Sequence, residues 1–383
     1  MNSLVAYLAD ISALAFILLG IVTGIGWLRR RDQSLGYLAL AIILLALVSA
    51  LGRLQTHMPI TIPALGQVMV LLFMGSAYAL LLYRSSLIPL ARRWHVIALL
   101  SMAAASGFFF AVSVLTKSPA WLFGSVVALI AIWCVAVGEP IVRFWLVARS
   151  LATVQAWRLR SLSLGFGALV LILVLAISAG SFSRAPLMQV LVFLVEIAIV
   201  PLLYASFSPP EWLRRQWRSG DEEGLRRFLE ELLIADDREA LSARALNWAT
   251  RLTGGDSAVL FDAKGTMTAA NGVTPEQVAE VRTQLPQLRR GVNRLSIRGV
   301  ERNGLMLPVA GLAGRGTLVI LAGPFTPGVG TDETSRVQQL MSAFVTAIDR
   351  RHLIVQLEET NAALRDANLH KSVFLANMSH ELR

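Results

Sequence analysis

Seven apolar stretches occupy most of the first 207 residues, and each is long enough to cross the hydrocarbon core of a membrane. A spanning helix needs about 20 predominantly apolar residues, because each residue adds roughly 1.5 Å to its length. The seven predicted spans are residues 4–27, 36–52, 64–83, 96–115, 121–142, 161–180 and 187–207. The gaps between them are short, so the sequence predicts a membrane α-helical bundle (a transmembrane domain over residues 1–207) without an extracellular binding domain.

Charge is distributed unevenly along the chain. Residues 1–219 hold 16 Lys/Arg and 5 Asp/Glu, a net of +11, whereas residues 220–383 hold 19 and 20, a net of −1. The basic residues of the apolar part gather in alternate gaps, as is typical of cytoplasmic loops. This bias predicts a multi-pass protein of the inner membrane, with its N-terminus outside and its C-terminal part in the cytoplasm. A nucleic-acid partner is not expected, because it would need a basic patch on a soluble domain.

Two acidic residues lie inside predicted spans, where ionisable groups are costly and often functional. Glu196 is near the middle of the seventh span, and Asp10 lies about two turns into the first. Each is a candidate site for a polar or cationic ligand or for a proton. The alternative is a carboxyl group that is protonated or hydrogen-bonded to a neighbouring helix, and we favour this alternative for Asp10.

Two further groups of charged residues lie at the ends of predicted spans. Glu139 and Arg143 are four residues apart on one predicted helix and are expected to pair. Arg53 and His57 follow the second span and are interpreted as residues of an outer loop.

A globular domain is predicted after the membrane part. Residues 208–220, which begin with Ser208-Pro209-Pro210, are interpreted as a juxtamembrane linker that can lie against lipid headgroups, and residues 221–347 as an α+β domain. Two helices are expected first, and a hairpin turn at Asn303-Gly304. Strands are expected at residues 257–262, 266–270, 295–300, 305–309 and 316–322. This order predicts an antiparallel sheet with helices on one side.

A long helix is predicted from about residue 331 to the end of the sequence. Its apolar residues are spaced 4, 7, 3 and 7 apart, which is typical of a coiled-coil seam. The residues of this seam are Leu353, Leu357, Leu364, Ala367 and Phe374. We predict a dimeric signalling helix over residues 348–370; the alternative is an amphipathic helix packed on its own domain.

The last turns of this helix carry the residues with the clearest chemistry. At about 100° per residue, one stripe of the helix carries Phe374, Leu375, Met378 and Leu382, and His380 lies nearly opposite. The imidazole is therefore predicted to face solvent. A neutral imidazole is nucleophilic near physiological pH, and the adjacent Glu381 is placed to orient the ring or to take its proton.

The string Phe-Leu-Ala-Asn-Met-Ser-His-Glu-Leu-Arg at residues 374–383 resembles the H-box of the histidine kinase dimerisation and phosphotransfer domain. The resemblance implies a sensor histidine kinase of a two-component system, in which His380 is the phosphoacceptor, Glu381 assists as acid or base, and two chains form a homodimer. It also implies a response regulator as partner, and ATP and Mg in a separate ATP-binding domain. The family continues with Thr-Pro, so we expect residues 371–383 to begin an incomplete domain of a longer product and this chain to be inactive as a kinase alone.

Residues 221–347 resemble a GAF sensor domain in element order and position, and a PAS domain is the alternative. Some GAF domains bind tetrapyrroles through cysteine or histidine, and this stretch contains neither. The single cysteine, Cys134, lies in a predicted span and cannot build a disulfide or a thiolate zinc site. We therefore expect no cofactor and no metal in this chain, and an unassigned small-molecule signal that is recognised within the bundle or reaches it through membrane lipid.

Two other functions remain open. A transporter would use Glu196 as a proton or substrate site, although the sequence lacks the internal repeat and paired broken spans typical of that class. A non-enzymatic receptor would signal through dimerisation of the terminal helix alone.

Overall fold

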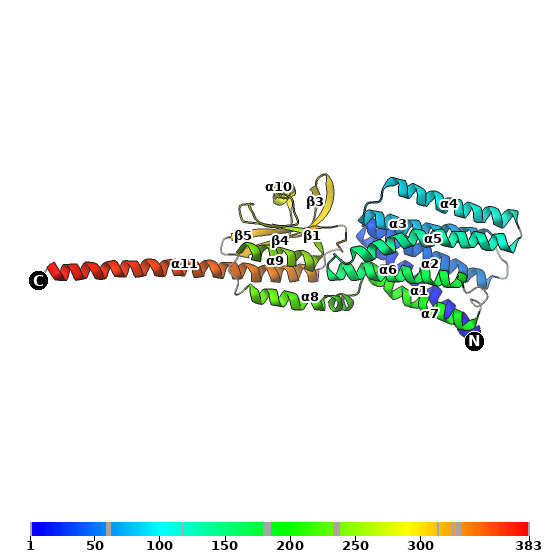
Figure 1. The fold of residues 1–383 in the computed structure, drawn as a ribbon, viewed down its shortest axis with the longest axis horizontal. Coiled ribbons are helices and arrows are strands. Elements are labelled where there is room, and N and C mark those ends of the chain that lie inside the picture. Colours follow the sequence, from blue (N-terminus) through cyan, green and yellow to red (C-terminus); the bar gives the residue numbers. More distant parts are fainter. Residues whose placement is uncertain are drawn as a thin grey trace. The chain divides into compact units, whose positions relative to one another are not determined.

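The computed structural model describes residues 2–58, 63–116, 118–178, 185–232, 238–311, 314–323, 325–326 and 331–381. The chain divides into two compact units, Met1–Arg218 and Ser219–Arg383 (Figure 1).

The first unit is a bundle of long apolar helices. These are α1 (Asn2–Arg30), α2 (Gln33–His57), α3 (Pro63–Leu87), α4 (Arg92–Leu115), α5 (Pro119–Val147), α6 (Thr153–Ser178) and α7 (Pro186–Phe207). In the described part of the chain, these seven are long and apolar enough to cross a membrane, which confirms the prediction of seven long apolar helices. Several extend beyond the predicted spans, because the polar and basic residues at their ends continue the helix past the apolar stretch.

Large side chains fill the centre of the bundle. Trp133, Phe144 and Phe166 are fully buried. The indole N–H of Trp133 on α5 donates hydrogen bonds to Phe73 O (3.0 Å) and Ser76 Oγ (3.2 Å) on α3, and the Trp133 ring stacks on Phe73 with 4.6 Å between centroids. These contacts join α3 and α5 closely, whereas α4 packs mainly against α5 and lies at the edge of the bundle.

The second unit is built on a five-stranded antiparallel sheet of order β2-β1-β5-β4-β3. The strands are β1 (Gly255–Phe261), β2 (Met267–Asn271), β3 (Gly291–Ile297), β4 (Val300–Gly311) and β5 (Gly314–Ala322). The helices are α8 (Glu211–Glu231), which begins before this unit, α9 (Arg238–Thr253), α10 (Pro275–Gln284), the 3-10 turn η2 (Leu285–Gln287) and α11 (Thr331–Glu381). The predicted antiparallel sheet and long final helix are confirmed.

Helices cover both faces of the sheet, so the prediction of helices on one side is wrong. On one face, Phe228 of α8, Leu246 of α9 and Phe344 of α11 pack against alternate residues of the strands. On the other, Val281 of α10 packs against Val259 and its neighbours (Figure 1). The sequence did not predict α10, because this ten-residue helix has too few apolar residues for a helical periodicity to be recognised. A capping box formed by Thr274 and Gln277 begins the helix.

The predicted hairpin turn at Asn303-Gly304 is also wrong. The chain turns at Arg298 (φ 50°) and Gly299 (φ 72°), and Asn303 and Gly304 lie within β4, paired with Arg294 and Asn293 of β3. Two successive residues with positive φ match the two-residue turn that suits the twist of a hairpin. At Gly304 the absence of a side chain allows close packing, because an added Cβ would lie 2.3 Å from Leu295 Cδ1.

The segment after α7 is helical almost from its start. Ser208-Pro209-Pro210 separates α7 from α8, as predicted, but α8 then runs without a break from Glu211 to Glu231. Most of the predicted linker 208–220 and the first predicted helix of the soluble part therefore belong to the same helix, α8.

Candidate functional site

The predicted phosphoacceptor lies at the end of α11. His380 and Glu381 are in the last turn of this helix, but their side chains lie outside the described part of the structure. The solvent exposure of His380 therefore stays a prediction. Nearby, Leu375 and Met378 of the predicted apolar stripe are about half exposed (54% and 43%).

The second half of α11 does not pack on its own unit. Leu340 and Phe344 are buried against the sheet, whereas residues 355–373 are all exposed. Leu357 and Leu364 of the predicted seam are 63% and 60% exposed. The alternative of an amphipathic helix that packs on its own domain is therefore wrong for this segment.

The two acidic residues predicted as ligand sites make contacts between helices. Ser12 Oγ on α1 donates a 2.7 Å hydrogen bond to Glu196 Oε2 on α7. Asp10 on α1 forms an ion pair with Arg53 on α2, and His57 Nε2 lies 3.5 Å from Asp10 Oδ1. Each carboxyl group thus bonds to a neighbouring helix, as the alternative interpretation supposed. Arg53 and His57 belong to the last turns of α2, so their assignment to a loop is corrected.

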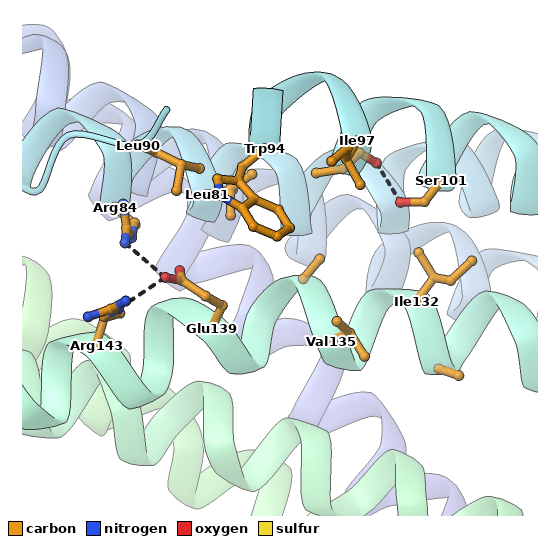
Figure 2. A pocket seen from close by; sticks show the side chains of 13 residues that line it. Leu81, Arg84, Leu90, Trp94, Ile97, Ser101, Ile132, Val135, Glu139 and Arg143 are labelled. Carbon is orange, nitrogen blue, oxygen red and sulfur yellow. Dashed lines mark hydrogen bonds and ion pairs between the residues drawn. The ribbon is translucent and has the colours of Figure 1, made fainter. Parts of the chain in front are cut away.

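A cavity of about 590 Å³ lies between α3, α4 and α5 (Figure 2). This size falls within the usual range for small-molecule sites, about 300–1,000 Å³. It is lined by Leu81, Arg84, Leu90, Trp94, Ile97, Ala98, Ser101, Ala131, Ile132, Val135, Ala136, Glu139 and Arg143. Most of these side chains are apolar, and the charged ones gather where α3 ends and α4 begins. Neither Asp10 nor Glu196 lines the cavity.

Three charged side chains form the polar end of the cavity. Arg84 Nη2 donates a 2.8 Å hydrogen bond to Glu139 Oε1, and Arg143 Nε lies 3.4 Å from the same oxygen. Arg84 Nη1 donates to the backbone oxygens of Ile88 (2.9 Å) and Pro89 (3.4 Å), just beyond α3. The predicted pairing of Glu139 with Arg143 is confirmed, but Glu139 also holds the more deeply buried Arg84. Figure 2 shows both guanidinium groups directed at this carboxylate.

Two atoms at this end lack hydrogen bonds. Within the described residues, Arg84 Nε and Glu139 Oε2 are buried and have no partner. The Arg84 side chain is only 4% exposed; that of Glu139 is 38% exposed, although its Oε2 is buried. A buried polar group without a partner is destabilising by about 1–3 kcal/mol. Both atoms are therefore enclosed by protein at the polar end of the cavity.

The walls of the cavity are partly open to the outside of the bundle. Trp94 and Ile97 on α4 are 53% and 52% exposed, and Val135 on α5 is 75% exposed. Apolar side chains with this exposure would face lipid in a helix that crosses a membrane. A molecule could thus enter the cavity between α4 and α5.

Sequence reasoning missed Arg84 and the cavity. By its position in the sequence, Arg84 belongs to the basic residues of a predicted cytoplasmic gap, where an exposed charge needs no partner. One signal was available, since Glu139 is the lone acidic residue of the fifth span and its partners were worth seeking on other helices.

Comparison with known proteins identifies no family. No protein-family model and no curated protein matches the chain. A solved structure that it resembles is the GAF domain of a protein described as a sensor histidine kinase from Pseudomonas syringae pv. tomato, with 20% identity. The match covers 38% of this chain and 99% of that one, with a TM-score of 0.27. A similarity of this size does not establish a shared fold.

Proposed function

We propose that this chain is the sensory input part of a membrane-bound histidine kinase, in which His380 accepts a phosphoryl group and passes it to an aspartate of a response regulator. The observation that carries the proposal is the ten-residue string at 374–383, which resembles an H-box and whose residues 374–381 form the end of the continuous helix α11. Seven apolar helices and a sheet unit ahead of α11 fit an input region.

In the proposed reaction, a ring nitrogen of His380 attacks the γ-phosphorus of ATP held by a separate domain, and the bond to the ADP oxygen breaks. The attacking nitrogen is the unprotonated one, and the proton on the other ring nitrogen then leaves to Glu381 or to water. The Mg ion bound with ATP offsets the charge on the phosphate oxygens. The role of α11 is to present the imidazole where the ATP-binding domain can reach it.

The exposed seam of α11 supports a homodimer as the working form. Leu353, Leu357 and Leu364 are each more than half exposed. Pairing two such helices would bury these side chains, and burial of apolar surface is stabilising by roughly 25 cal/mol per Å². The residues 221–347 would act in this scheme as a GAF-like or PAS-like relay between the membrane helices and the exposed part of α11.

A phosphorylation assay tests the proposal. The chain is joined after Arg383 to the ATP-binding part of a histidine kinase and incubated in proteoliposomes with ATP labelled at the γ-phosphate. We expect His380→Gln to abolish incorporation of label, because an amide cannot accept the phosphoryl group. His370→Gln, an exposed change on the same helix, is the matched control and should label normally. Equal labelling of His380→Gln and the unmodified protein would refute the assignment.

Transport is not proposed, because the sequence lacks the internal repeat and the paired broken spans typical of that class.

A further inference from the structure

Two arginines line the cavity between α3, α4 and α5, and they differ in what they offer a ligand. The Nη atoms of Arg84 donate to Glu139 and to two backbone oxygens, and its Nε is enclosed by protein. Arg143 is 59% exposed and contacts Glu139 through Nε, at 3.4 Å. Among the described residues, the Nη atoms of Arg143 donate no hydrogen bond. A ligand in the cavity can therefore reach these two Nη atoms of Arg143.

The charge at this end of the cavity favours an anionic ligand. Glu139 is the single acidic residue in α3, α4, α5 and the loops that join them. Arg84 and Arg143 line the cavity, and Arg92 and Arg93 begin α4, where both are exposed. Four arginines and one glutamate give a net charge of +3. An anion lowers this repulsion, and the fork of a guanidinium group pairs with both oxygens of a carboxylate or of a phosphate group.

The rest of the cavity is apolar and suits one hydrocarbon chain. Ile97 and Ala98 line it on α4, and Ile132 and Val135 line it on α5 (Figure 2). Along α5 the lining covers residues 131–143, roughly 18 Å at 1.5 Å per residue. The volume of about 590 Å³ is typical of a site for one drug-sized molecule. A phospholipid with two acyl chains is larger than that, so a single chain fits better.

The position of Arg143 matches the way an amphiphile lies in a membrane. Arg143 is one turn from the end of α5 at Val147, so its guanidinium group would lie near the lipid headgroups if α5 crosses a membrane. The apolar lining extends from there toward the middle of the helix. A ligand with its head at Arg143 and its chain in the cavity would keep the orientation of a lipid and could enter between α4 and α5.

We propose that this cavity binds a single-chain amphiphile with an anionic head, whose head pairs with the Nη atoms of Arg143 and whose chain lies between α4 and α5. The molecule is the signal of the proposed sensor, so the inference deepens that function and rests on it for its meaning. Binding is measured without phosphotransfer, so failure of one proposal is distinguishable from failure of the other. The same chemistry has two sources, a fatty acid from the medium and an acidic lysophospholipid from the membrane.

Quenching of Trp94 fluorescence tests the proposal in the chain of residues 1–383, reconstituted in phosphatidylcholine nanodiscs. Trp94 lines the cavity from the first turn of α4, close to the polar end (Figure 2). The probe is a fatty acid with bromine on a carbon near the carboxylate, because bromine quenches a tryptophan that it contacts. Subtracting the signal of Trp94→Phe isolates Trp94 from the other eight tryptophans of the nine in the chain. We expect saturable quenching, and weaker quenching when the bromine is at the far end of the chain.

The head group is tested with the methyl ester of the same brominated acid, which keeps the chain and lacks the charge. With affinities expressed per mole fraction of ligand in the bilayer, the ester should bind about ten-fold more weakly, because it loses a hydrogen bond between charged groups. Arg143→Gln should bring the acid down to the affinity of the ester. Arg149→Gln removes the same charge just beyond α5, outside the cavity, and should bind like the unmodified chain. Equal affinity for acid and ester in the unmodified chain would overturn the proposal, as would equal losses in the two variants.

The place of the hydrocarbon chain is tested by filling the cavity. Ala98→Phe puts a large side chain into the lining and should weaken binding of the brominated acid by ten-fold or more. Ala103→Phe is the matched control, because Ala103 is exposed on the same helix and does not line the cavity. If Ala98→Phe binds the acid as tightly as Ala103→Phe does, the chain lies elsewhere and the proposal is wrong.

The source of the ligand is distinguished with lysophosphatidylglycerol that carries bromine at the same place on its chain. Tighter binding of this lipid assigns the site to a membrane component, and tighter binding of the fatty acid assigns it to a diffusible one; either supports the shared chemistry. If brominated phosphatidylcholine quenches Trp94 fully and an unbrominated fatty acid does not relieve that quenching, bulk lipid fills the cavity and the inference fails.

Discussion

Arg84 is a buried cation whose charge is balanced by a neighbouring helix. Its side chain is 4% exposed, and Glu139 is its carboxylate partner at 2.8 Å. Removal of one partner of a buried pair is costly because the remaining charge is left uncompensated. Arg143 cannot replace Glu139, since it carries the same charge as Arg84.

We therefore expect Glu139→Ala to lower the free energy of unfolding in detergent by about 2 kcal/mol, less than for a fully enclosed pair because Glu139 is partly exposed. Glu139→Gln keeps an oxygen for Arg84 and should lose about half as much. Thermal unfolding monitored by circular dichroism measures both changes. If Glu139→Ala unfolds at the same temperature as the unmodified chain, the ion pair is not structural.

The sequence predicts which residue of the same helix pairs with a carboxylate, but it does not predict the partner on another helix. The four-residue spacing of Glu139 and Arg143 predicts their contact directly. Arg84 lies 55 positions away, and only the packing of α3 on α5, through Trp133 and Phe73, brings it to Glu139. The same limit applies to Arg53, whose contact with Asp10 depends on how α1 packs on α2.

Among the elements, α11 is buried in its first part and exposed in its later part. Its first part contributes Val337, Leu340 and Phe344 to the core of the sheet unit, and its later residues stand exposed. Leu364 belongs to the predicted seam, whereas Leu369, five residues on, is equally exposed but points about 140° away from it.

Disulfide cross-linking separates these two positions. In a Cys134→Ser background, which removes the chain's single cysteine, we expect Leu364→Cys to form a disulfide-linked dimer under mild oxidation. Seam residues of two paired helices approach within the Cα separation of about 4.4–6.8 Å that a disulfide needs. Leu369→Cys should stay monomeric on a non-reducing gel. Equal cross-linking at both positions would indicate random collision instead of a seam.

Elements with strong periodicity were predictable, and short ones were not. The long apolar helices and the final helix could be predicted because their long runs of residues fit a helix and no other secondary structure. The hairpin turn was misplaced because glycine has two uses: Gly304 allows close approach of Leu295, while Gly299 supplies the positive φ of the turn. α10 was missed because its burial depends on a sheet face that no local pattern reveals.

For the whole molecule, the distribution of arginine predicts the direction of insertion. Met58 follows α2 in a gap poor in basic residues, and Ser150 follows α5 in a gap rich in them. Both residues are exposed in the structure.

We expect a membrane-impermeant maleimide to label Met58→Cys, but not Ser150→Cys, in intact cells of the Cys134→Ser background. The physical reason is that basic loops stay on the cytoplasmic side during insertion. Permeabilised cells, in which both positions should react, provide the control. The opposite labelling pattern would place His380 outside the cell, away from ATP.

The length of α11 gives it mechanical leverage. Phe344 is fixed in the core of the sheet unit, and His380 lies roughly 54 Å farther along the helix axis at 1.5 Å per residue. If that stretch stays straight, a tilt of about five degrees at the anchored part displaces the far end by roughly 5 Å, about one helical turn. A side-chain rearrangement of modest size around Phe344 would thus suffice to carry an imidazole into or out of reach of an incoming nucleotide.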